Sequence, residues 1–179
     1  MIREVMRQTI VKTDLKDLQV GDKFEVAGIP MVVIGERYGD ITIQQYGELD
    51  CREFDLAGCT KYEKSDIKEY LETGYGAKFP KEFLSLVKDG QFFLLSEKDI
   101  TPATTKYQYY KDTENRIKFG KDGKAVAWWL SDECISSKRS RKQLDNTAYV
   151  RLVASPGHIA MMQPSCEEGI APACVLHFD

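Results

Sequence analysis

Hydrophobic and polar positions alternate over short runs in the first third of the chain. Residues 23–26 (KFEV) and 30–36 (PMVVIGE) have the pattern of two strands, and the Ala27-Gly28 pair between them is a tight hairpin signal. Residues 41–46 (ITIQQY) alternate in the same way after the turn sequence RYGD. The pattern predicts a small antiparallel meander.

A helical period replaces this alternation in the next segment. Ile67, Tyr70 and Leu71 share one face of a helix over 65–74. Ser65 is a suitable N-cap for that helix, and Gly74 can end it. We therefore expect one amphipathic helix here.

A second helix is expected over 80–90, because a proline fits the first helical turn and a glycine closes the segment. Phe83, Leu84 and Val87 share its apolar face. The short aromatic run QFFLLS at 91–96 predicts a buried strand.

From residue 97 to 123 the pattern weakens, because this segment is polar, turn-rich and aromatic. We expect little regular structure there, and long loops in compact domains are often functional. The last third again alternates like strands, at 125–131, 147–154, 159–163 and 170–178. A basic segment, SSKRSRKQLDN at 136–146, is expected to form a loop between the first two of these strands.

Length and composition favour one globular domain. The chain has 179 residues, of which 42% are hydrophobic, and this is enough for a sizeable core. We expect residues 1–14 to be an N-terminal extension and residues 15–179 to be the domain.

Charges interrupt the first residues, and no apolar run is long enough to cross a bilayer. The expected location is the cytoplasm, with no membrane partner.

The charge is unevenly distributed. The formal net charge is -3, but residues 106–151 hold eleven Lys or Arg against six Asp or Glu. A basic middle on an acidic protein can face an acidic partner, since summed fields steer association. The alternative is that these are solvated loop charges.

No catalytic motif is present. Phosphate-binding glycine patterns and a G-x-S-x-G elbow are both absent. The five cysteines form no C-x-x-C pair, so reduced, mostly buried thiols are expected. A metal site would have to use Cys166, Cys174 and His177, which is one ligand fewer than a closed zinc site needs. We expect no metal, no cofactor and no enzymatic activity.

Several segments together resemble the DUF6273 family, a domain of unknown function common in Gram-positive bacteria and their phages. They are LKDLQVGDKFEVAGIPMVVIGE, KSDIKEYLETGY, FFLLSEKD, WWLS and GIAPACVL, in that order, over about residues 15–175. Family members in turn resemble distantly the C-type-lectin and formylglycine-generating-enzyme fold. The resemblance implies a single α+β domain with small antiparallel sheets, two helices and long late loops, in a bacterial host cell.

The chain departs from the family pattern at two places. Ser131-Asp132-Glu133 follows Trp128-Trp129-Leu130 where the family commonly ends in proline, and the closing GIAPA has an alanine where the family usually has arginine. The missing arginine removes a fork of donors that could tie loops together. We therefore transfer only the fold from this resemblance.

The adjacent tryptophans Trp128 and Trp129 are the only two in the chain. Neighbouring side chains of a strand point to opposite faces, so both cannot enter one core layer. We expect one to pack inward beneath the loops and the other to lie against the loop region or a second hydrophobic layer. A structural role is favoured over ligand stacking.

The function we expect is that of a non-enzymatic binding module, phage- or prophage-encoded, that engages a macromolecule through its late loops. The expected partner is a protein, and direct nucleic-acid binding is the less favoured option because the sequence pI is about 5.5. The candidate binding residues are aromatic or basic: Tyr107, Tyr109, Tyr110, Arg116, Lys118, Lys138, Arg139, Arg141 and Lys142.

The alternative is a phage-encoded anti-defence inhibitor, such as an anti-CRISPR, that blocks a bacterial immune nuclease by protein–protein binding. An acidic protein can occupy a basic nucleic-acid channel. In that case the acidic segments 48–55 and 63–72 carry the function.

Overall fold

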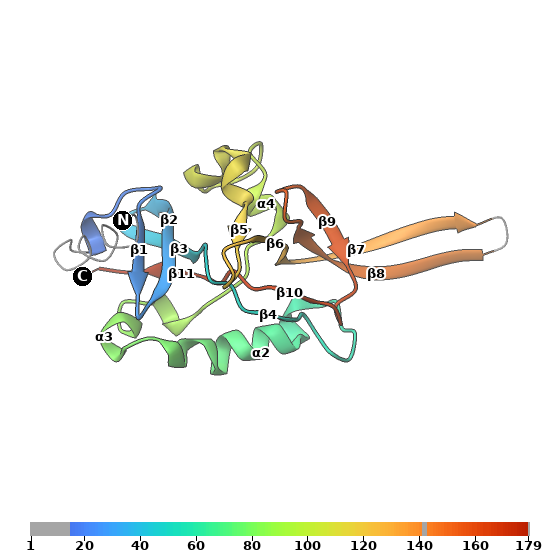
Figure 1. Ribbon diagram of the computed structural model, residues 1–179, viewed down its shortest axis with the longest axis horizontal. Helices are drawn as coiled ribbons and strands as arrows, with labels where there is room; N and C mark the ends of the chain where they lie inside the picture. Colours follow the sequence, from blue (N-terminus) through green and yellow to red (C-terminus); the bar gives the residue numbers. More distant parts are fainter. Residues whose placement is uncertain (1–14, 141–142, 179) are drawn as a thin grey trace.

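The computed structural model describes residues 15–140 and 143–178. They form a mixed α+β domain with several sheets and few helices, from which one long hairpin projects (Figure 1). This confirms the α+β class at the level of architecture. No helix in the described residues is long and apolar enough to cross a membrane.

The first sheet has four antiparallel strands in the order β1-β2-β3-β11. Its strands are β1 (Lys23–Val26), β2 (Ile29–Arg37), β3 (Asp40–Gln45) and β11 (Ala173–Leu176). The predicted meander is therefore confirmed, and the closing strand of the chain completes the sheet beside β3. Two-residue turns join β1 to β2 and β2 to β3.

Both turns have positive φ at their two central residues. The angles are 52° at Ala27 and 79° at Gly28, and 55° at Tyr38 and 84° at Gly39. This is the pattern of a type I′ turn, whose twist matches that of the flanking strands.

The second sheet has five strands in the order β4-β10-β7-β8-β9. Its strands are β4 (Cys51–Glu53), β10 (Glu167–Gly169), β7 (Trp128–Ser140), β8 (Gln143–Val153) and β9 (Ile159–Met162). All pairs are antiparallel except β10 with β7, which touch at Gly169 and Trp128. A separate two-stranded sheet pairs β5 (Lys118–Phe119) with β6 (Ala125–Val126).

Strands β7 and β8 extend far beyond their neighbours as a two-stranded arm (Figure 1). Strand β9 pairs with β8 only from Val150 to Val153, whereas β7 and β8 remain paired out to Ser140 and Gln143. The predicted basic loop over 136–146 is therefore wrong for its described part, because both of its flanks continue the ladder. We call the paired segments beyond Cys134 and Tyr149 the β7–β8 arm.

The longest helix, α2 (Asp66–Thr73), lies where the helical period predicted it. The side chain of Ser65 caps its first turn, and Gly74 follows its last residue. The other helices are single turns: η1 (Leu15–Asp17), η2 (Tyr62–Lys64), η3 (Tyr75–Lys78), α3 (Lys81–Leu84), η4 (Lys88–Gly90), α4 (Glu97–Ile100), η5 (Gln108–Lys111) and η6 (Thr113–Arg116).

Two expectations for residues 80–96 need correction. The expected helix over 80–90 is only α3 followed by η4, and the left-handed Asp89 (φ 56°) interrupts helical geometry. The expected strand at 91–96 is an extended segment with a single isolated bridge, Phe93 to Ala173. This segment is buried beside β11 but does not continue the ladder.

The core has two parts, and β2, β7, β8 and β11 each contribute side chains to both. Trp129 packs in a cluster with Phe54, β1–β3 and α2, whereas Trp128 packs in a second cluster with Tyr107 and Tyr110. Both indoles are fully buried. The alternation of a strand therefore sends the two tryptophans into separate hydrophobic layers, as expected.

Candidate functional site

Four of the predicted binding residues lie inside the protein. Tyr107, Tyr110, Arg116 and Lys118 are buried, and Tyr109 is half-buried. The segment from 97 to 123 has little regular structure, as expected, but it packs its aromatic residues into the second core cluster. The interpretation of the four buried residues as a partner-binding surface therefore needs correction, whereas that of Tyr109 stays a prediction.

Hydrogen bonds explain why these polar side chains are inside. The Tyr110 hydroxyl donates to Gln44 Oε1, and Gln44 Nε2 donates to the carbonyl of Ala171 at 2.9 Å. Arg116 Nε donates to the carbonyl of Ile100 at 2.9 Å, and Trp128 Nε1 donates to the carbonyl of Arg116 at 2.9 Å. Buried polar groups are normally paired in this way, so these residues tie the irregular segment to the sheets.

Lys118 is the exception in this buried region. Its Nζ has no hydrogen-bond partner within the described residues, and it lies 5.2 Å from the ring centroid of Trp128 and 5.6 Å from that of Tyr110. Burial, together with the nearby charge of Lys23, lowers the pKa of Lys118 to about 7. The amine is enclosed by aromatic rings that stabilise its cation only in part.

Of the other four predicted residues, two belong to the β7–β8 arm. Lys138 lies opposite Asp145 and Arg139 lies opposite Leu144 in the strand register, so both are on the projecting part. Arg141 and Lys142 lie outside the described residues. The arm therefore brings two of the predicted basic residues onto a single structural element.

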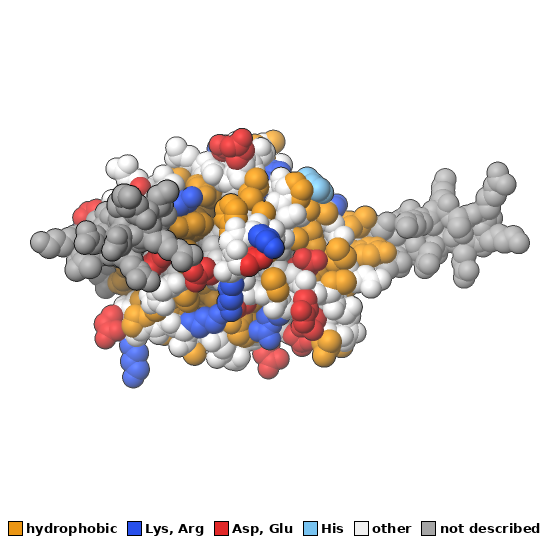
Figure 2. All heavy atoms as spheres, in the orientation of Figure 1, with side chains coloured by type: hydrophobic (Ala, Val, Ile, Leu, Met, Phe, Trp, Pro, Cys, Tyr) orange, Lys and Arg blue, Asp and Glu red, His pale blue; other side chains and the backbone are white. Residues whose placement is uncertain are grey.

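Exposed apolar side chains lie at the root of this arm. Ile135 is 62% exposed, Met161 41% and Met162 37%. Figure 2 shows hydrophobic atoms gathered where the arm leaves the body, while acidic and basic side chains are interspersed over the rest of that face. We call Ile135 and Met162, which lie on the same face of the sheet in the β7–β8–β9 register, the root patch.

Two carboxylates of the acidic segments that an inhibitor was expected to use form contacts within the protein itself. Asp50 forms ion pairs with Lys78 and Lys121, and those contacts lower the pKa of its carboxyl against the opposing effect of burial. Asp55 is buried and accepts hydrogen bonds from backbone groups, including that of Cys59 at 2.8 Å. These two carboxylates stabilise local structure.

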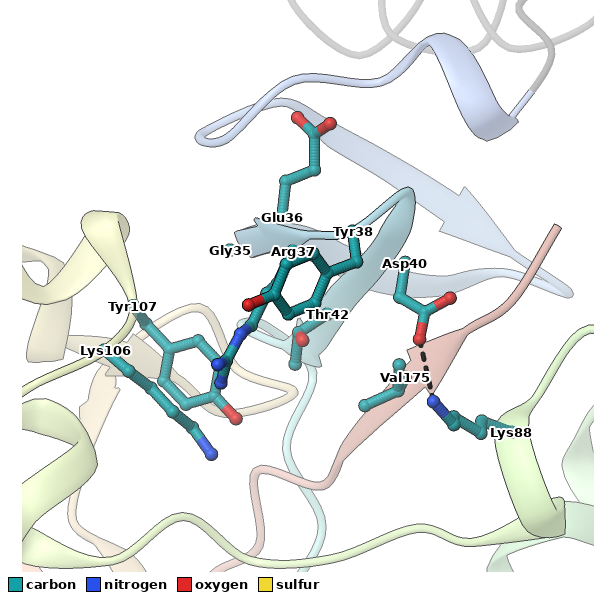
Figure 3. Close-up of a pocket in the computed structure, with 10 residues that line it drawn as sticks. All are labelled: Gly35, Glu36, Arg37, Tyr38, Asp40, Thr42, Lys88, Lys106, Tyr107 and Val175. Atoms are coloured by element: carbon teal, nitrogen blue, oxygen red, sulfur yellow. Dashed lines mark hydrogen bonds and ion pairs between the residues drawn. The ribbon is translucent and has the colours of Figure 1, made fainter.

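A hollow of about 690 Å³ opens at the other end of the molecule, beside the β2–β3 turn (Figure 3). Sequence reasoning identified the turn but not this site. The lining comes from β2, β3, β11, η4 and the segment before η5: Gly35, Glu36, Arg37, Tyr38, Asp40, Thr42, Lys88, Lys106, Tyr107 and Val175. The sequence does contain one indication of this site, because Tyr38 occupies a turn position that favours Asn or Gly.

Tyr107 forms a fixed wall of this hollow. A Cβ on Gly35 would lie 2.8 Å from Tyr107 Cδ1, so the ring packs directly on the glycine backbone where β2 shifts register. Burial raises the pKa of Tyr107 to about 12, although a hydrogen bond with Thr42 opposes the shift. The phenol is therefore neutral at physiological pH.

The carboxylate of Asp40 is held at the opposite side of the hollow. It accepts a hydrogen bond from Lys88 Nζ at 2.9 Å and lies 2.6 Å from His177 Nδ1. The hydrogen bonds from His177 and then Lys88 lower the pKa of Asp40 below its usual value. Asp40 is thus ionised and paired.

The residues considered for a metal site are not assembled. Cys174 is buried in the first core cluster, while His177 is exposed beside Asp40. Within the described part of the chain, no group of three or more His, Cys, Asp or Glu side chains is placed to hold a metal ion. The expectation of mostly buried thiols is wrong, because only Cys174 is buried among the five.

The chain matches no family model, no curated protein and no solved structure. Membership of DUF6273 therefore stays a prediction.

Proposed function

We propose that the protein is a non-enzymatic binding module that binds an acidic protein partner through the β7–β8 arm. The observation that carries this proposal is the projection of two paired strands beyond the body (Figure 1). An arm of this kind has no packing role within the described chain, since β9 and β10 accompany only its base. Beyond that base, β7 and β8 pair only with each other among the described strands.

The charge of the arm indicates the kind of partner. Residues 136–147 hold four Lys or Arg and one Asp, whereas the whole chain has a net charge of -3. The basic charge is thus concentrated on the element that reaches furthest from an acidic body. Complementary potentials of this kind steer encounter and set orientation.

The root patch favours a protein over a nucleic acid. Methionine is enriched at protein interfaces, and the centres of such interfaces are apolar and surrounded by polar rims. The root patch with the basic arm beyond it has this arrangement, whereas nucleic-acid interfaces are much more positively charged throughout.

The test is capture of partners from a bacterial lysate by the purified protein, with and without nuclease treatment. A variant with Lys138, Arg139, Arg141 and Lys142 changed to Glu is expected to lose the captured protein. The control changes Lys64, Lys81, Lys98 and Lys124 to Glu, since these four exposed body lysines give the same change of net charge. Equal loss in both variants, or capture that disappears with nuclease, would contradict the proposal.

The root patch is tested separately. Ile135→Ser combined with Met162→Gln should weaken capture without altering the charge of the arm. Because these side chains are exposed, the variant is expected to remain folded, which circular dichroism checks. Undiminished capture would remove the root patch from the interface.

A further inference from the structure

We propose that the hollow beside the β2–β3 turn binds a nucleotide, with Arg37 and Lys106 at its phosphate and Tyr38 against its base. This site is independent of the proposed function, since the hollow and the arm lie at opposite ends of the molecule (Figures 1 and 3). A volume of about 690 Å³ lies within the range of small-molecule sites.

The charges in the hollow leave two cations available. Asp40 is engaged by Lys88 and His177, and Figure 3 shows Glu36 pointing away from the other lining residues. Arg37 and Lys106 are exposed and make no ion pair within the described residues. An anion that enters this hollow therefore meets two unpaired cations and no unpaired carboxylate directed at it.

Both cations are held beside aromatic rings. The Cζ atom of Arg37 lies 4.9 Å from the ring centroid of Tyr38, and the Nζ atom of Lys106 lies 5.0 Å from that of Tyr107. Cation–π contacts of this kind restrain long side chains. A guanidinium so placed matches the oxygen geometry of a phosphate, which it can bind with two hydrogen bonds.

Tyr38 is the feature that folding alone does not explain. It is 92% exposed and has a φ of 55°, a left-handed conformation that is unfavourable for a bulky residue. Asn, Asp or Gly would satisfy the turn better. An exposed, strained tyrosine beside a charged hollow is therefore explained by binding, because its free face can stack on a nucleobase.

The rest of the hollow is preorganised for such a ligand. Tyr107 is fixed against Gly35 and is neutral, so it adds no negative charge near a phosphate. The Lys88–Asp40–His177 contacts hold the opposite side. A rigid site loses less conformational entropy on binding than a mobile one.

The experiment is isothermal titration calorimetry of the full chain with AMP, adenosine, inorganic phosphate and a short single-stranded oligoadenylate. AMP should bind more tightly than adenosine or phosphate, because only AMP engages both halves of the site. Tighter binding of the oligoadenylate than of AMP assigns the ligand to a nucleic-acid strand, and equal binding assigns it to the free nucleotide. Absence of measurable binding by both would overturn the proposal.

Tyr38→Asn separates binding from folding. The variant should weaken AMP binding by about tenfold to a hundredfold, the worth of one stacked base, while its melting temperature stays equal or rises. Ala27→Asn is the matched control, since Ala27 occupies the same position of the β1–β2 turn, and it should leave AMP binding unchanged. Unchanged AMP affinity in Tyr38→Asn would refute the stacking role.

Arg37→Gln and Lys106→Gln test the phosphate half. Each variant should weaken AMP binding and lower its dependence on salt, while leaving adenosine binding as it was. A loss of adenosine binding of the same size as that of AMP would contradict the assignment of these cations to the phosphate.

Discussion

At the scale of single residues, Lys118 is the least favourable side chain in the core. A cation buried without a hydrogen bond or counter-ion costs free energy, and the rings of Tyr110 and Trp128 offset only part of that cost. The folded protein releases the proton at a pKa of about 7, whereas the ordinary pKa of a lysine is 10.5. Folding and proton release are therefore coupled at this residue.

We predict that Lys118 makes the folded state more stable as pH rises from 7 to 9. In this window the unfolded chain retains the proton and the folded chain has lost it, so raising the pH favours folding. The contribution is about 1.4 kcal/mol per pH unit at most. The measurement is the free energy of unfolding in urea at several pH values.

Lys118→Met is the matched comparison for this prediction. Methionine has a similar length and packs well against aromatic rings, so the variant should be more stable than the wild type at pH 7. The difference between the two proteins should shrink towards pH 9. A difference that does not change with pH would show that the lysine is not neutralised on folding.

At the scale of elements, the sequence predicted the strands and the helix whose ends are marked by turn or capping residues. The β1–β2–β3 meander and α2 were predicted because turn residues, alternation and a capping serine all agree there. The segments at 80–96 and 136–146 were wrong for different reasons. An extended Val87 (ψ 115°) and a left-handed Asp89 interrupt the helix expected in the first of these. The second is polar because it pairs outside the core, so it lacks the apolar alternation by which strands are recognised.

The candidate site was less predictable than the fold. Tyr107, Tyr110 and Lys118 have the composition of a binding loop, and nothing local distinguishes an aromatic residue in an irregular segment from one buried in a second core. The hollow is assembled from β2, β3, β11 and the segment before η5. Those contacts are set by the pairing of distant strands, which the sequence pattern does not specify.

Ser65 gives a prediction for α2. Its Oγ accepts a hydrogen bond from the backbone N–H of Lys68 at 3.3 Å and donates one to the carbonyl of Tyr62 at 2.7 Å. Ser65→Ala should lower the free energy of unfolding by about 1 kcal/mol, the usual cost of a lost N-cap. Chemical denaturation measures this change.

Ser85→Ala is the control for this cap. Ser85 is exposed and follows the last turn of α3, where its Oγ donates to the carbonyl of Glu82. The control should change stability by no more than about 0.5 kcal/mol. Equal effects at the two serines would show that the cap of α2 has no special importance.

At the scale of the whole molecule, β7 joins the two core clusters. Trp129 belongs to one and Trp128 to the other, and each indole N–H is bonded to a distant backbone carbonyl, that of Arg52 at 3.0 Å and that of Arg116 at 2.9 Å. If β7 detached from one cluster, the tryptophan that it contributes to the other cluster would also be exposed. We therefore expect the domain to unfold cooperatively.

Trp128→Phe and Trp129→Phe test this expectation, because each variant retains one tryptophan that reports on one cluster. Each should be less stable than the wild type by about 1 to 3 kcal/mol, owing to the lost hydrogen bond and volume. Within each variant, the midpoints from tryptophan fluorescence and from circular dichroism should coincide. Separate midpoints within one variant would mean that the two clusters unfold independently.

The β7–β8 arm has a consequence for the behaviour of the protein at high concentration. Beyond Trp128, towards its end at Ser140, β7 pairs only with β8 among the described strands, so its other edge offers backbone donors and acceptors to any passing strand. Clustered positive charge on such an edge makes two copies repel each other before they can pair. Neutralising the arm by acetylation or mutation would therefore remove this repulsion and favour self-association through strand pairing.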